Sequence, residues 1–150
     1  MGQLNYVWTN TESLLIYLIA GLAKVDKETA IIIFLTLNTT RARLDLVERL
    51  AKMSKTTDEC RKAVLTVTDQ LTRQGKLRNK YSHCIYSFDE TGTRASTQLM
   101  RIFETKDAIK YGKVENLDDA EMQNISKSIE VIGKINKDIW KIVEDNNFPS

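Results

Sequence analysis

The residues best suited to chemistry lie in one short segment, residues 77–83. His83 is the only histidine of the chain, and an unperturbed imidazole has the side-chain pKa closest to neutral pH. Arg78 and Asn79 precede it by five and four positions. Arginine presents a planar, permanently charged fork that matches phosphate oxygens. The segment therefore combines a group that can move a proton with a group that can bind a phosphate.

This combination suits cleavage of RNA without a metal ion. In a helix, positions four apart share a face, so Asn79 and His83 would point the same way, and the long side chain of Arg78 could swing toward them. The ribose hydroxyl attacks the neighbouring phosphorus, which requires a base and an acid. Arginine stabilises the charge that grows on the phosphoryl oxygens. A scheme with one histidine as base and another as acid cannot be built within a chain that has a single histidine, so we expect a homodimer in which two copies meet.

Further residues around the segment could contact an RNA substrate. These substrate-binding candidates are Arg73, Lys76, Lys80 and Tyr81. A structural alternative stays open, in which His83 caps a helix C-terminus and the neighbouring cations are solvated. The chain would then be a helical interaction protein whose basic segment meets an acidic partner, and lysine could replace arginine in it.

Composition indicates one globular domain spanning residues 1–150. The chain is 42% hydrophobic and 28% charged, with one proline and six glycines among 150 residues. This length allows a real core, and the composition argues against a disordered chain. The net charge of +2 is too small to indicate a nucleic-acid partner, so any basic surface must be local.

The sequence predicts neither a metal centre nor a membrane span. Cys60 and Cys84 are too few for a disulfide framework, and the adjacent His83 and Cys84 lack further ligands at zinc spacing. We expect reduced thiols in the cytoplasm, no metal and no cofactor. The apolar run of residues 14–25 is shorter than the roughly 20 residues of a span, and Glu12 precedes it. We expect a buried helix there and no membrane partner.

Helical patterns cover most of the chain. We expect a first helix over residues 9–24, after a short lead-in, with Thr9 and Glu12 as a capping box. Good helix formers flank the β-branched run that follows, and no turn signal interrupts it. We therefore expect one long second helix over residues 27–53, with a bend near residues 38–40.

Two further helices frame the candidate segment. The third begins at Thr57 or Asp58 and continues toward His83 unless Gly75 ends it. The last covers residues 118–145 and has an apolar stripe at intervals of three or four. The stripe consists of Ile125, Ile129, Ile132, Ile135, Ile139 and Ile142.

Strand-like runs separate these two helices. Residues 85–88 and 98–103 favour extended structure, residues 89–92 form a turn signal, and residues 109–114 could add to the pair. The expected fold is mainly all-α. It is a four-to-five-helix up-and-down bundle with a short β-hairpin-like excursion before the last helix.

A short motif at the end of a core helix resembles the signature of the HEPN superfamily. It consists of an arginine and an asparagine, then three residues, then a histidine. Here the matching residues are Arg78, Asn79 and His83. The resemblance implies a dimeric helical bundle, in which the arginine and the histidine are catalytic and the asparagine supports them. Many such domains are ribonucleases, some of them toxins or defence components, and others bind nucleotides or proteins without known catalysis.

One position departs from the pattern of the toxin members. There, a tyrosine two positions after the histidine is the site at which a nucleotidyltransferase partner modifies the toxin. This chain has Ile85 at that position and Tyr86 one residue further on. The resemblance therefore implies an antitoxin or another protein partner without specifying that form of control.

Overall fold

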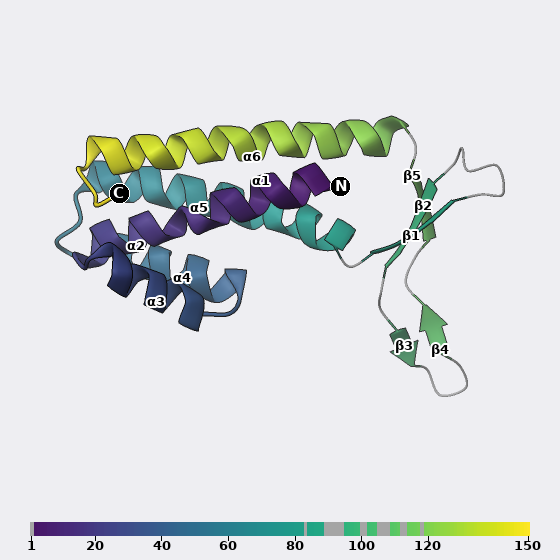
Figure 1. Cartoon of the computed structure of the whole chain (residues 1–150), viewed down its shortest axis with the longest axis horizontal. Helices are drawn as coiled ribbons and strands as arrows, with labels where there is room; N and C mark the ends of the chain where they lie inside the picture. Colours follow the sequence, from purple (N-terminus) through teal and green to yellow (C-terminus); the bar gives the residue numbers. More distant parts are fainter. Residues whose placement is uncertain are drawn as a thin grey trace.

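The computed structural model describes residues 2–82, 84–88, 95–99, 102–104, 109–111, 114–117 and 119–150, and the side chains of residues 2–80 and 120–150. The described part is mainly helical, with six helices, and consecutive helices from α2 onward alternate in direction to form a bundle (Figure 1). His83 and the predicted turn at residues 89–92 lie outside the described residues.

The chain begins with two helices that continue in nearly the same direction, α1 (Gly2–Ser13) and α2 (Leu15–Ala23). They meet at Leu14, whose N–H donates to the carbonyl of Thr11 and whose carbonyl accepts from the N–H of Tyr17, each at 3.0 Å. Helix α2 contains most of the apolar run and is buried as predicted. Among the described residues, no helix has the length and apolar character that crossing a membrane requires.

The predicted lead-in and the capping box at Thr9 are wrong. Both Thr9 and Glu12 lie inside α1, which already begins at Gly2. Leu4, Trp8 and Thr11 are buried at helical spacing, so packing against the bundle holds residues that have no strong apolar pattern of their own. Burial in the folded protein therefore outweighs the local capping signal.

The predicted long helix over residues 27–53 is also wrong, because it is two helices, α3 (Lys27–Thr36) and α4 (Thr40–Ala51). Leu37 is extended, with φ −80° and ψ 103°. Thr39 then caps α4, since its Oγ1 accepts a hydrogen bond from the N–H of Ala42 at 3.1 Å. The bend that we expected near residues 38–40 is thus a complete break with a new N-cap.

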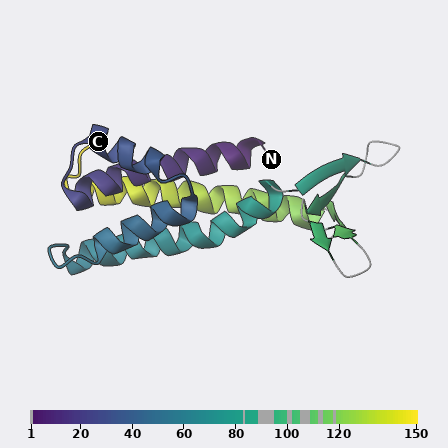
Figure 2. The same ribbon diagram turned by 90° about the horizontal axis from the view of Figure 1, so that it is seen from below.

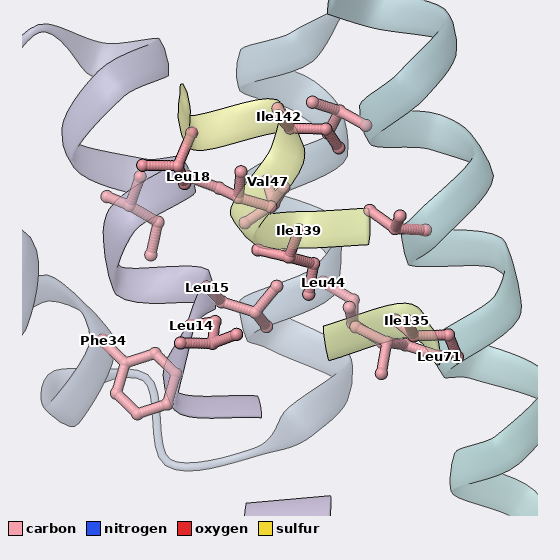
Figure 3. Packing of buried hydrophobic residues seen from close by; sticks show 14 of the residues in the cluster. Leu14, Leu15, Leu18, Phe34, Leu44, Val47, Leu71, Ile135, Ile139 and Ile142 are labelled. Atoms are coloured by element: carbon pink, nitrogen blue, oxygen red, sulfur yellow. The ribbon is translucent and has the colours of Figure 1, made fainter. Parts of the chain in front are cut away.

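The two longest helices are α5 (Asp58–Ser82) and α6 (Asp119–Asp145). Gly75 does not end α5. It lies where a Cβ atom would be 3.1 Å from Cη2 of Trp8, so the absent side chain lets the indole of α1 approach the helix. The isoleucine stripe of α6 faces the core as predicted, with Ile129 half-buried. Figure 3 shows Ile135, Ile139 and Ile142 directed toward apolar side chains of the other helices, among them Leu15, Leu18, Val47 and Leu71.

Short strands lie beyond the C-terminal end of α5 and the N-terminal end of α6 (Figure 1). Antiparallel β1 (Cys84–Phe88) pairs with β2 (Ala95–Leu99), from Cys84 opposite Leu99 to Phe88 opposite Ala95. On its other edge β2 pairs with β5 (Val114–Leu117), while β3 (Ile102–Glu104) and β4 (Ile109–Tyr111) form a separate pair. The predicted strand over residues 98–103 therefore falls across the end of β2 and the start of β3.

An ion pair whose side chains are only 17% and 12% exposed joins the first half of the chain. The carboxylate of Glu12 on α1 accepts hydrogen bonds from Nη1 of Arg43 at 3.0 Å, Oγ1 of Thr40 at 2.8 Å and Nε1 of Trp8 at 3.0 Å. Arg43 also donates through Nε to the carbonyls of Leu37 at 2.7 Å and Phe34 at 3.0 Å. The pair therefore connects α1 to the end of α3 and the start of α4.

The C-terminal residues fold back over α2. The N–H of Phe148 donates to the carbonyl of Val143 at 2.9 Å, and Asn147 takes the left-handed conformation with φ 53° that such a reversal requires. The ring of Phe148 occupies the space where a side chain at Gly21 would begin. Glycine at position 21 is therefore what allows this contact.

We predict that Gly21→Ala lowers the free energy of unfolding by about 1–3 kcal/mol, because the new methyl group overlaps the ring of Phe148. Gly133→Ala is the matched control, since a Cβ at that position in α6 meets nothing within 4 Å. It should raise stability by about 0.5–1 kcal/mol through helix propensity alone. Urea denaturation of the three proteins measures both effects. Equal effects of the two substitutions would mean that Phe148 does not pack on α2.

We predict that Glu12→Ala lowers the free energy of unfolding by about 3–5 kcal/mol, because it leaves the guanidinium of Arg43 buried without its carboxylate. Asp45→Ala removes an exposed partner of Arg41 and should change stability by less than about 1 kcal/mol. The double variant Glu12→Leu with Arg43→Met should recover part of the loss. Denaturant unfolding measures all three, and a small effect of Glu12→Ala would contradict a structural role for the pair.

Candidate functional site

The predicted site residues lie in the last three turns of α5. Arg73, Lys76, Arg78, Asn79 and Lys80 all belong to this helix, with side chains that the structure describes. The side chain of Tyr81 and all of His83 lie outside the described residues. The structure therefore gives the surroundings of the arginine and the asparagine, and the predicted approach of His83 to either of them stays a prediction.

Arg78 is a half-buried cation without a carboxylate partner in the described part of the chain. Its Nη1 donates a hydrogen bond to Oδ1 of Asn79 at 3.2 Å. Its Nε is buried and has no acceptor among the described residues. A buried donor without a partner is unfavourable, so the guanidinium retains both charge and hydrogen-bonding capacity that an anion could use.

Asn79 and Lys76 face a groove between α4 and α5, which we call the α4–α5 groove. Figure 2 shows these two helices side by side and running in opposite directions. The cavity has a volume of about 380 Å³, and Arg41 and Glu48 of α4 line its other wall. Arg78 does not line it, so the structure brings Arg78 and Asn79 into contact at the rim and separates Arg78 from the interior of the groove.

Arg73 occupies a different position from the other candidates. Its guanidinium pairs with Asp69 one turn earlier in α5, with Nη2 and Oδ2 2.9 Å apart, and both side chains are mostly exposed. Such exposed pairs contribute little stability and break easily. Arg73 is therefore a surface cation outside the groove, while Lys76, which no ion pair engages in the described part of the chain, opens into it.

Two contacts hold this end of α5 in place. The hydroxyl of Ser128 on α6, which is buried, donates to Oε1 of Gln74 at 2.6 Å. Trp8 of α1 packs against Gly75, the residue of α5 that follows Gln74. The turn that precedes Arg78 is therefore fixed to both neighbouring helices, as a site on a rigid element requires.

The sequence around the end of α5 is basic, although the whole chain is nearly neutral and α6 begins at the same end with Asp119 and Glu121. Residues 70–88 contain four lysines and arginines and no aspartate or glutamate. Cations at the C-terminal end of a helix also interact favourably with the helix dipole. The basic side chains expected from the sequence thus belong to the last turns of α5, where they could attract an anion without a large net charge.

The groove contains residues that the sequence did not identify. Arg41 and Glu48 belong to a stretch with alternating charges, a pattern that is typical of a solvated helix face. Arg43 belongs to the same stretch and lies instead in the buried ion pair. Only the packing of α4 in the fold distinguishes the groove residues Arg41 and Glu48 from Arg43, since charge alternation alone does not say which residues face a neighbouring helix.

Cys60 has no part in this site. It is buried near the start of α5, and burial raises the pKa of its thiol, so the reactive thiolate is scarce at neutral pH. Among the described side chains, no group of three or more histidine, cysteine, aspartate or glutamate residues could hold a metal ion.

Comparison of the chain with protein-family models, with curated proteins and with solved structures gives no match.

We predict that Arg78→Met leaves stability unchanged or raises it by up to about 1 kcal/mol. The substitution removes a buried donor that has no acceptor and keeps an unbranched apolar side chain along the path of the arginine stem. Gln74→Ala should instead lower stability by about 1–3 kcal/mol, because it leaves the buried Ser128 hydroxyl without its acceptor. Thermal and urea denaturation measure both. A strong loss in Arg78→Met would show that this arginine stabilises the fold.

Proposed function

We propose that this protein is a metal-independent endoribonuclease of the HEPN type, with a site formed at a homodimer interface. The observation that supports it most is the state of Arg78. It is a half-buried guanidinium at the end of a fixed helix, it contacts Asn79, and it has no carboxylate partner in the described part of the chain. Cations kept in this way at a cost in stability are characteristic of functional sites.

Each residue of the motif has a role in the proposed reaction. The ribose 2′-hydroxyl attacks the adjacent phosphorus, and the bond from phosphorus to the 5′-oxygen of the next nucleotide breaks. His83 accepts the hydroxyl proton, and its copy in the second subunit protonates the leaving oxygen. Arg78 stabilises the charge on the phosphoryl oxygens. Asn79 orients the guanidinium through its Oδ1, which the hydrogen bond between them supports.

Exposed apolar residues near the same end of the bundle support a dimer. Tyr6, in the second turn of α1, is 73% exposed, and Met122, in the first turn of α6, is 53% exposed. Both helices begin at the end of the bundle where α5 finishes (Figure 1). Large exposed apolar side chains often belong to protein contacts, so a second copy docked here would lie at the end of the bundle that carries Arg78. A toxin or defence role, with an antitoxin as partner, is the biological setting that we propose.

A second candidate is a non-catalytic module that binds a nucleotide or a protein. The observation that favours it is the α4–α5 groove, which Lys76 and Asn79 line at one end and which could hold a ligand without any contribution from His83. In this case the same basic end of α5 binds an anionic group and no bond is broken.

We predict that the wild-type protein cleaves a mixed RNA pool in EDTA and that His83→Ala reduces the rate by about 10²-fold or more, through loss of proton transfer. Arg78→Lys should reduce it by about 10²-fold, because the charge remains while the two-pronged contact to phosphate is lost. Arg49→Lys, at the exposed end of α4, is the matched control and should retain full activity. Gel analysis of the products and light scattering of each protein measure activity and oligomeric state.

Three outcomes would contradict this function. An intact wild-type dimer that does not cleave RNA would favour the binding module. Equal cleavage by wild type and His83→Ala would indicate a contaminant or a different catalytic group. Unchanged activity in Arg78→Lys would remove the phosphate-binding role from that residue.

A further inference from the structure

We propose that the α4–α5 groove binds a guanine base and that Glu48 recognises it. For a guanine within RNA, this inference rests on the proposed nuclease function and defines the preferred sequence at the cleavage site. A free guanine nucleotide has the same chemistry and would serve the binding module equally. The inference comes from the dimensions of the groove, the distribution of charge along it and the one carboxylate that its other residues leave unused.

The groove is long enough for a nucleotide and adjoins the candidate site. It extends along α5 from Asp69 to Asn79, which is about 15 Å at the rise of an α-helix. Asn79, whose Oδ1 contacts Arg78, lies at the end nearer the C-terminus of α5. A phosphate bound by Arg78 would therefore have the mouth of the groove directly beside it.

The floor of the groove is apolar. Leu44 of α4 and Leu71 of α5 are buried side chains that line the groove, and Gly75 adds no side chain to it. Apolar side chains accept the faces of a nucleobase, while hydrogen bonds to its edge provide specificity. The groove thus has apolar surface for the ring and polar groups along its length.

Charge along the groove separates the place of a phosphate from that of a base. At one end, Lys76 and Asn79 can bind an anion. Further along, the carboxylates of Asp45 and Asp69 are already paired with Arg41, at 3.8 Å, and with Arg73, at 2.9 Å. These pairs largely balance the charge of the two aspartates, so the unpaired Glu48 carboxylate is what disfavours a phosphate in this part of the groove. The phosphate therefore belongs at the basic end and the base belongs inside.

Glu48 is the carboxylate of the groove that remains available. Its side chain is half-buried, and its oxygens accept no hydrogen bond and join no ion pair among the described residues. An ionised carboxylate offers two adjacent acceptors and no donor. A ligand that fits it must present two adjacent donors.

Among the four RNA bases, guanine presents that pair on its Watson–Crick edge, as N1–H beside the N2 amino group. Adenine and cytosine place a ring nitrogen acceptor beside their amino group, and uracil has one N–H between two carbonyls. Each of these would set an acceptor against the Glu48 carboxylate and lose at least one hydrogen bond. A two-pronged contact of this kind typically gives about tenfold discrimination or more against the wrong base.

The test measures binding apart from cleavage. The full-length protein is titrated with the 5′-monophosphates of guanosine, adenosine, cytidine, uridine and inosine, and backbone amide shifts are followed by NMR. Guanosine monophosphate should bind about tenfold tighter than the others and shift amides of α4 and α5 along the groove. Inosine, which lacks the N2 amino group, should lose most of this advantage. Glu48→Gln in α4 should abolish the preference for guanine. Glu59→Gln, the same substitution at the start of α5 and outside the groove, should leave the preference unchanged.

The results also separate this inference from the nuclease function. Equal affinities, a guanine preference that survives Glu48→Gln, shifts outside the groove, or no shift with any nucleotide would overturn the guanine site. RNA oligonucleotides that differ at one base then form the second arm. Cleavage without a guanine preference overturns the inference and leaves the nuclease intact. Guanine-selective binding without cleavage supports the site and overturns the nuclease.

Discussion

The arrangement of the first half of the chain depends on the ion pair between Glu12 and Arg43. A buried charge without its partner is strongly unfavourable, whereas the pair with its additional hydrogen bonds is tolerated. The guanidinium reaches the carboxylate only if α1 passes beside the start of α4, and its bonds to the carbonyls of Phe34 and Leu37 require α3 to end where it does. One interaction thus determines where three helices lie relative to one another, which is the specificity role that buried ion pairs can have.

The same interaction extends to the candidate site through Thr40. This residue donates to Glu12 and also lines the α4–α5 groove, so the anchor of α4 is directly connected to the wall of the groove. On the other side, Gln74 and Gly75 fix α5 to α6 and α1. The groove is therefore formed between two helices that are each held from behind. Such support keeps the positions of Asn79 and Glu48 constant, and a base can be recognised only by groups whose positions are constant.

How much of this could be predicted from sequence differs between elements for physical reasons. The buried α2 and the isoleucine stripe of α6 were predictable because each has its apolar residues at helical intervals. The start of α1 was not, because it depends on the packing of Leu4 and Trp8 against the bundle, and the misassigned Glu12 has its partner Arg43 31 positions away. The break at Leu37 was predicted within a few residues, but as a bend in one helix rather than as a boundary between two helices. For the site, the cluster of Arg78 and Asn79 could be found from residue types. The groove could not be predicted, because Glu48 comes to face residues of α5 only when α4 packs on α5.

The contact of Phe148 with Gly21 has a consequence for the order in which the bundle opens. It attaches the C-terminal end of α6 to α2, so this end cannot fray by itself as helix ends usually do. The opposite end of α6 has Met122 exposed in its first turn. Local opening of α6 should thus begin at its N-terminus and proceed toward the contact of Phe148 with Gly21. Amide hydrogens near residue 142 should therefore exchange more slowly than those near residue 124. Opening is thereby favoured at the first turn of α6, while Gln74 and Gly75 keep the last turns of α5, which carry Arg78, attached to the neighbouring helices.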